Sequence, residues 1–283
     1  MEPSYRLVIS CPDRVGLVAA VSDFIADNGG WITEANHYTD PSDNWFFMRH
    51  VIKSNSLPFD AEGFRQAFAP IAEDFDMDWR VTDTSCRPRV TILASKEGHC
   101  LQDLLYHWKY GDLGFDIPYV ISNHENLRDY VQWYGVPFEY MPVDDDKEAH
   151  FQNVSDGIEQ SCPDVVVLAR YMQILPDWLC DKYPNRIINI HHSFLPSFAG
   201  ARPYHQAKER GVKLTGATCH YVTSELDAGP IIEQDVIRIS HHHSVGDIVR
   251  LGRDVEKTVL TRGLRYHLED RVLIHNNKTI VFA

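Results

Sequence analysis

The chain has 283 residues, 44% of them hydrophobic and 24% charged, which is the composition of an ordinary globular protein long enough for two cores. Its formal net charge of -13 argues against nucleic acid or an anionic membrane as a partner. No apolar run reaches the length of a membrane span, and residues 1–4 lack the basic start of a secretory signal. The six cysteines are scattered without a CxxC pair, so we expect reduced thiols and a cytoplasmic protein.

The first part of the chain, residues 5–81, has the element order of a small α+β unit. Its first helical pattern is formed by Val15, Val18, Val21, Phe24 and Ile25, which are spaced by three and four. Strands are predicted at 5–10, 31–38, 45–52 and about 77–81, and a second helix at about 60–74. This order predicts a ferredoxin-like domain.

The loop between the first strand and helix, CPDRVGL at 11–17, resembles that of the ACT domain, a regulatory module that binds small amino acids, often across a dimer interface. A small amino-acid effector is therefore expected at the start of the helix, where backbone N–H groups attract a carboxylate. The residues expected to bind it are Asp13, Arg14, Val15, Gly16 and Leu17. Paired sheets of this kind favour a homodimer or homotetramer, and a purely structural dimerisation domain is the alternative.

The polar, proline-ended segment at 82–88 predicts a linker, which separates a first domain at 1–84 from a second at 85–283. The second domain alternates strands and helices, as in an open, mostly parallel Rossmann-like α/β sheet with helices on both faces. Strands are predicted at 89–94, 116–122, 137–141, 165–169, 187–191 and 215–222, and helices at 101–110, 125–134, 147–160 and 245–268. Ligands of such sheets bind beyond the carboxyl ends of the strands.

The strand at 187–191 ends in a cluster of polar groups, Asn189-Ile190-His191-His192. Alternation places Asn189 and His191 on one face of the sheet and His192 on the other. An amide and an imidazole on one face can stabilise an oxyanion at a carbonyl carbon, but they need an acid–base partner. Asp227, in the turn that follows the strand at 215–222, is the predicted partner.

Two segments, NIHHSFLPSFAGARPYHQA at 189–207 and TGATCHYVTSELDAGPII at 215–232, resemble the folate-dependent formyltransferase family. The hallmark of that family is Asn-x-His on a strand with Asp in a following loop, here Asn189, His191 and Asp227. With the ACT-like unit in front, the resemblance implies a hydrolase branch that cleaves 10-formyltetrahydrofolate to formate and tetrahydrofolate in one-carbon and purine metabolism. It implies that Asn189 and His191 stabilise the tetrahedral intermediate, that Asp227 orients the imidazole and relays a proton, and that no metal or other cofactor takes part.

The resemblance also implies a folate-binding slot beside the catalytic residues. Its expected lining is Arg170, Met172, Ile174, Leu175, Val222, Thr223 and Glu225, and Arg202 is expected, with Arg170, to meet the glutamate tail. Core packing is the alternative for the apolar members, and a solvated surface position is the alternative for the arginines.

The loop at 95–100 indicates which nucleophile attacks. It has one glycine, no G-x-G and a glutamate, so it is a poor cradle for the phosphate of an acceptor such as glycinamide ribonucleotide, and water is favoured. Formyl transfer to such an amine and an amino-acid sensor with an inactive transferase fold are the alternatives. The histidines at 241–243 diverge on an extended segment, so we predict a loop or helix start capped by Ser244 rather than a metal site.

Overall fold

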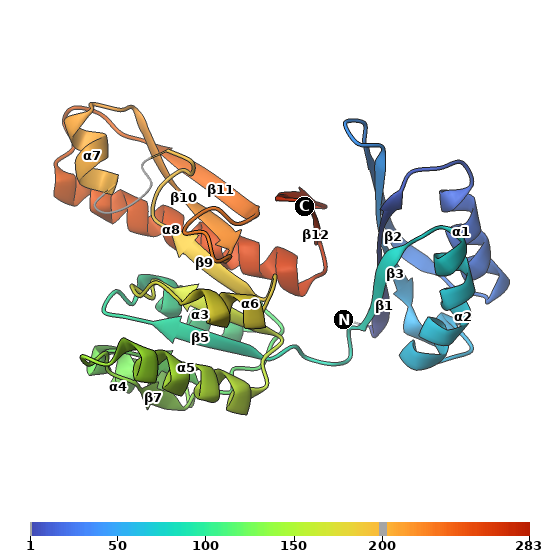
Figure 1. Cartoon of the computed structure of the whole chain (residues 1–283), viewed down its shortest axis with the longest axis horizontal. Coiled ribbons are helices and arrows are strands. Elements are labelled where there is room, and N and C mark those ends of the chain that lie inside the picture. The colour runs from blue at the N-terminus through green and yellow to red at the C-terminus, as the bar shows by residue number, and fades with distance from the viewer. Residues whose placement is uncertain (1, 198–202) are drawn as a thin grey trace. The chain divides into compact units, whose positions relative to one another are not determined.

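The computed structural model describes residues 2–197 and 203–283, and the chain divides into two compact units. Unit 1 comprises Met1–Arg87, Glu269–His275 and Ile280–Ala283, and unit 2 comprises Pro88–Leu268 and Asn276–Thr279 (Figure 1). The boundary after Arg87 lies within the linker predicted at 82–88. At the C-terminus, two segments expected in the second domain belong to unit 1.

Unit 1 contains a four-stranded antiparallel sheet with the order β2-β3-β1-β4. Its strands are β1 (Ser4–Pro12), β2 (Ile32–Asp40), β3 (Trp45–Lys53) and β4 (Asp78–Asp83), and its helices are α1 (Leu17–Asp27), α2 (Ala61–Asp74) and the short 3-10 helix η1 (Ser54–Ser56). Alternate strand residues, such as Ile9 and Met48, pack with Phe24 and Phe64 of the helices in one core. The predicted ferredoxin-like order is confirmed.

The start of α1 differs from the predicted pattern. The helix begins at Leu17, and Val15, which precedes it, is fully exposed, while Val18 is 39% exposed. The buried face consists of Leu17, Val21, Phe24 and Ile25. Their spacing of four, three and one already forms a complete apolar stripe, so Val15 and Val18 lie outside it.

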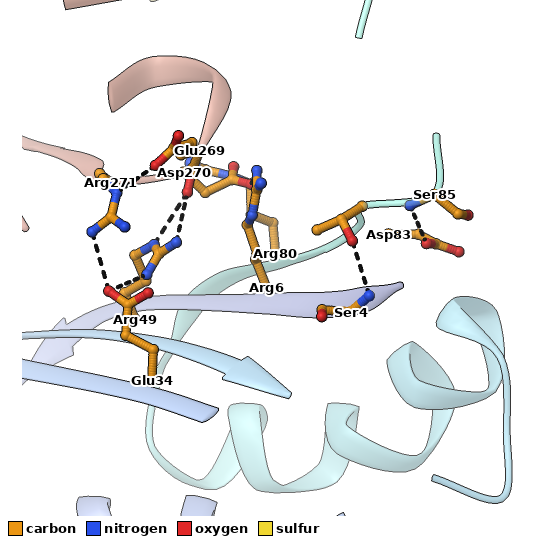
Figure 2. Close-up of polar contacts among 11 residues, drawn as sticks. Ser4, Arg6, Glu34, Arg49, Arg80, Asp83, Ser85, Glu269, Asp270 and Arg271 are labelled. Carbon is orange, nitrogen blue, oxygen red and sulfur yellow. Dashed lines mark hydrogen bonds and ion pairs between the residues drawn. The ribbon is translucent and has the colours of Figure 1, made fainter. Parts of the chain in front are cut away.

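The C-terminal segment of the chain completes unit 1. On the sheet face opposite the helices, Leu273 of β12 (Val272–His275) and Ile280 of β13 (Lys278–Val281) pack with Val8, Phe47 and, near the end of the chain, Phe282. Figure 2 shows the polar contacts beside this cluster. Arg49, which is only 2% exposed, lies 2.9 Å from Glu34 and donates two hydrogen bonds, of 3.1 and 3.0 Å, to the carbonyl oxygen of Glu269.

Unit 2 contains a seven-stranded sheet with the order β11-β10-β9-β8-β5-β6-β7. The strands are β5 (Val90–Ala94), β6 (Val120–Ser122), β7 (Phe138–Tyr140), β8 (Val165–Ala169), β9 (Ile187–His191), β10 (Leu214–Tyr221) and β11 (Ile231–Arg238). The helices are α3 (His99–Lys109), the 3-10 helix η2 (Glu125–Leu127), α4 (Arg128–Trp133), α5 (Lys147–Ser161), α6 (Asp177–Lys182), α7 (Pro203–Glu209) and α8 (Val245–Leu268). Strands β5 to β9 pair in parallel, which confirms the predicted Rossmann-like, mostly parallel sheet.

Two predicted elements of unit 2 need correction, and one strand was not predicted. Strand β10 runs antiparallel to β9, and the unpredicted β11 runs antiparallel to β10. The strand predicted at 116–122 begins only at Val120, because Pro118 has no N–H to contribute to a ladder; Asp116 forms an isolated bridge with Arg89. The helix predicted at 125–134 is split into η2 and α4. Within residues 2–197 and 203–283, no helix has the length and apolar character needed to cross a bilayer.

Candidate active site

The antiparallel pairing of β9 with β10 places the polar end of β9 opposite two polar residues. Asn189 is the direct partner of His220, and His191 is the partner of Thr218. Directly opposed residues present their side chains on the same face, so the Asn189 amide nitrogen lies 3.2 Å from Nε2 of His220. This register anchors Asn189 and His191 at the carboxyl end of β9, next to the end of β8.

Asp227 reaches the same place through the turn between β10 and β11. Its backbone adopts the left-handed conformation, with φ of 56°, which aspartate tolerates better than most residues. At Gly229 a Cβ atom would collide with the carbonyl oxygen of Tyr221, so only glycine lets the turn fold back against β10. As a result, Oδ2 of Asp227 lies 3.2 Å from Nδ1 of His191, and Oδ1 lies 3.8 Å from Nε2 of His220.

The electrostatics of this group assign the protons. Burial alone raises the pKa of Asp227, but the hydrogen bond and charge of His191 outweigh it, and the net pKa lies below the ordinary value. The ionised carboxylate can only accept, so Nδ1 of His191 carries the proton that it shares with Asp227. Nε2 of His191 is buried and has no hydrogen-bond partner among the described residues. That atom is therefore free to meet a reacting group.

His220 was not singled out by the sequence analysis, and it connects Asn189 to this group. Its Nδ1 lies 2.9 Å from the carbonyl oxygen of Tyr221, so Nδ1 donates and Nε2 keeps its lone pair. Burial lowers the pKa of His220, which keeps the ring neutral. Nε2 can then accept one N–H of Asn189, which sets the orientation of the amide.

The three predicted catalytic residues line one cavity of about 650 Å³, a size typical of small-molecule sites. Most of the predicted substrate-binding residues line it as well: Arg170, Met172, Ile174, Leu175, Val222 and Thr223. Glu225 is not among the described lining residues, and Arg202 lies outside the part of the chain that the structure describes. Core packing accounts for the buried Leu175, but Met172 and Ile174 are 54% and 69% exposed, so their apolar side chains face open space.

The cavity has further polar residues that sequence reasoning did not place there. His192, predicted to face away, also lines it, because β9 ends at His191 and strand alternation stops. Burial and the charge of Arg170 lower the pKa of His192 to about 4. Further polar residues of the lining include Glu97, His99, Tyr204, Arg253 and Glu256.

One group in this polar lining has the residue types of a metal site. Ligand atoms of His99, Cys100 and Glu256 lie within 4.8 Å of one another. However, Nε of Arg170 lies 3.4 Å from the same Glu256 oxygen that meets His99, and burial raises the pKa of Cys100 well above its ordinary value. A guanidinium already beside the carboxylate and a thiol that stays protonated do not fit a cation.

The histidines at 241–243 form part of a loop, as predicted. Nδ1 of His243 accepts a hydrogen bond of 3.0 Å from the backbone N–H of Ser240. The hydroxyl of Ser244 accepts one of 3.1 Å from the N–H of Asp247, so Ser244 caps α8.

The loop predicted to bind an effector lies in unit 1. The backbone N–H of Asp13 donates to the carbonyl oxygen of Asn44 at 2.8 Å, and the Asn44 side chain donates back to Asp13 at 3.0 Å. The guanidinium of Arg14 lies over the ring of Phe75 at 4.3 Å. Gly16 immediately precedes α1. Because Asn44 belongs to the turn between β2 and β3, this turn holds the start of the loop in place.

Comparison with known proteins places the chain in a family. Residues 88–264 match the formyl transferase family, and the chain belongs to it. Over 99% of its length it is 49% identical to the formyltetrahydrofolate deformylase of Bacillus subtilis, covering 94% of that protein. The crystal structure of a formyltetrahydrofolate deformylase from Pseudomonas syringae pv. tomato is 62% identical, with a TM-score of 0.99 over 100% of this chain and 95% of that one.

The amine-transferring branch of the family is a more distant relative. Glycinamide ribonucleotide transformylase 1 from Symbiobacterium toebii is 29% identical, with a TM-score of 0.66, and the match covers 70% of this chain and 95% of that one. The likeness to the deformylases therefore spans the whole chain, whereas the likeness to this transformylase spans only part of it.

Proposed function

We propose that this protein hydrolyses 10-formyltetrahydrofolate to formate and tetrahydrofolate. The observation that carries the proposal is the meeting of Asn189, His191 and Asp227 in one cavity, in a chain that is similar along its whole length to formyltetrahydrofolate deformylases. Each residue type alone is common, but together they supply an oxyanion donor, an imidazole and an ionised carboxylate around one point.

In the proposed mechanism, water attacks the formyl carbon and forms a new C–O bond. The Asn189 amide donates to the negative oxygen of the tetrahedral intermediate, and Nε2 of His191 donates to it from the imidazolium form of the ring, in which Nδ1 keeps its hydrogen bond to Asp227. Asp227 holds the proton on Nδ1 of His191 and takes up the proton that the water loses. The intermediate then collapses as the proton held by Asp227 passes to N10 of the folate and the C–N10 bond breaks, and formic acid leaves and ionises to formate. The exposed apolar side chains of Met172 and Ile174 are suited to hold the flat pterin.

The proposal extends to regulation and context. Unit 1 would serve as an ACT-like domain that binds a small amino acid near residues 13–17, and the chain would act as a homodimer or homotetramer in the cytoplasm, where its formate supplies purine synthesis. Calorimetric titration with glycine, methionine and serine tests the effector, and sedimentation tests the assembly. The absence of both heat and any change in activity would leave unit 1 a structural element.

One assay separates the proposed hydrolysis from its alternatives. The purified protein is incubated with 10-formyltetrahydrofolate without an acceptor, and tetrahydrofolate and formate are measured. Release of both without an amine supports hydrolysis. A requirement for glycinamide ribonucleotide would instead identify a transferase, and inactivity under both conditions would identify a sensor with an inactive transferase fold.

A further inference from the structure

The lining of the cavity contains two chemically different groups of residues. Leu168, Leu175 and Val222 belong to a single apolar cluster of unit 2. The other group, here called the polar side, is not used by the proposed mechanism, and Glu256 of α8 contacts three of its members; it consists of Glu97, His99, Arg170, Tyr204, Arg253 and Glu256.

Glu256 is a buried carboxylate with three partners from three other segments. It is only 1% exposed. One of its oxygens accepts a hydrogen bond from the hydroxyl of Tyr204 in α7. The other lies 2.7 Å from Nε2 of His99, at the start of α3, and 3.4 Å from Nε of Arg170, directly after β8. Burial alone raises the pKa of Glu256, but His99 and Arg170 outweigh it, so the carboxylate stays ionised.

The backbone is adapted to this arrangement. At Gly252, one turn before Glu256, a Cβ atom would collide with the hydroxyl and ring carbons of Tyr204, so glycine is what lets Tyr204 lie against α8 and reach the carboxylate. Arg170 adopts φ of 61°, a left-handed conformation that is unfavourable for a residue with a Cβ atom. Apolar side chains at these positions would stabilise the fold as well as a buried ion network does. The presence of the ion network at the cavity therefore points to a role in the site.

The charges on this side of the cavity cancel in pairs. Arg170 is matched by Glu256, and Arg253 lies 2.6 Å from Glu97. Neither arginine among the described lining residues is left for a phosphate, and the loop that carries Glu97 and His99 has a single glycine, Gly98. An acceptor with a phosphate would bring its charge toward two carboxylates without meeting an unpaired arginine.

We propose that Glu256, by holding Arg170 and His99, is a specificity determinant that closes this side of the cavity to anionic amine acceptors and leaves water as the nucleophile. This inference rests on the proposed hydrolase function, and it names the class of acceptor that the site rejects.

The test uses the full chain with the substitution Glu256→Gln. The amide keeps the shape of the side chain and an oxygen for Tyr204, but loses the charge that holds Arg170. The probe is inorganic phosphate, titrated by calorimetry. We expect phosphate to bind at least tenfold more tightly to the variant than to the wild type, because the released guanidinium gains a charge-assisted partner. Equal affinities would overturn the inference.

A matched control breaks the other ion pair of the polar side, between Arg253 and Glu97. Arg253 is 45% exposed, so Glu97→Gln should leave phosphate affinity within about threefold of wild type, since solvent screens that cation. If Glu256→Gln does not fold, as judged by circular dichroism, Glu256→Met replaces the carboxylate with an apolar chain of similar size and carries the same expectation.

Because phosphate titration requires no turnover, the result is independent of the hydrolysis assay. A wild-type protein that releases no formate would refute the proposed function, whereas unchanged phosphate affinity in a folded Glu256 variant would refute the specificity role. Formyl transfer to glycinamide ribonucleotide by the variant, at a rate at least tenfold above wild type, would be a further expected consequence.

Discussion

His220 offers the sharpest test of how the candidate site is organised, because it acts on Asn189 without being one of the predicted catalytic residues. Replacing His220 with phenylalanine keeps a ring of similar size at a position that is only 2% exposed. The substitution removes the acceptor for the Asn189 amide and the donor to the Tyr221 carbonyl. The amide then loses the contact that sets its orientation.

The size of the effect follows from the geometry. The hydrogen bond between Asn189 and His220 measures 3.2 Å, and a neutral bond of this kind contributes about 1 kcal/mol net. Complete loss of an oxyanion donor typically costs about 10²–10³ in rate. A misoriented donor falls between these limits, so we expect kcat of the His220→Phe variant to fall about tenfold to a hundredfold. KM should change less than kcat, because the oxyanion forms only after substrate has bound.

The assay is steady-state hydrolysis of 10-formyltetrahydrofolate by the wild type, His220→Phe and His220→Gln. The glutamine amide can accept from Asn189 and donate to Tyr221, so this variant should recover part of the lost kcat, which a purely structural role would not predict. Thermal unfolding shows whether each variant is folded. A folded His220→Phe protein with kcat within twofold of wild type would refute the positioning role of His220.

Three further outcomes are expected. Asn189→Ala and His191→Ala should each lower kcat about 10²–10³-fold with little change in KM, measured in the same assay; full turnover would remove that residue from the mechanism. Arg49→Met, which breaks a buried ion pair and two hydrogen bonds, should lower the free energy of unfolding in urea by roughly 2–4 kcal/mol, whereas Arg250→Ala, in an exposed pair, should change it by less than about 1 kcal/mol. Burial and His37 lower the pKa of His50 from 6.5 to about 4, so the unfolded chain binds a proton that the native protein excludes. This residue should lower the stability by up to about 3 kcal/mol from pH 6.5 to 4, so the loss of stability over that range should be smaller by this amount in His50→Gln, where His192 still contributes.

The part of the site that can be predicted from the sequence is the part that depends on residues close together in the chain. Strands β8 and β9 coincide with their predicted bounds, because each is a short apolar run between polar or proline-containing segments. His220 illustrates the limit. It sits in a strand that was predicted, but its contact with Asn189 depends on β10 running antiparallel to β9 with Asn189 opposite His220, and no local pattern specifies that register.

The C-terminal segment shows the same limit over a longer span. Residues 269–283 follow α8 directly, so chain order assigns them to the second domain. In the structure the carbonyl of Glu269 instead satisfies Arg49, 220 residues away in the chain. A buried arginine needs partners for its donors, but the sequence cannot say which distant segment supplies them.

Glu256 shows that a signal can be visible in the sequence while its meaning is not. The buried stripe of α8 contains Ile248, Gly252, Val255, Glu256 and Val259, a helical spacing with one charged residue in it. A carboxylate at such a position predicts a buried partner, since an isolated buried charge would neutralise itself. Its partners His99 and Tyr204 lie 157 and 52 residues away, and only the packing of α8 against α3 and α7 brings them together. Glu256 can therefore be singled out from the helical periodicity of the sequence alone. Its proposed role in selecting water over an amine depends on contacts that only the fold creates.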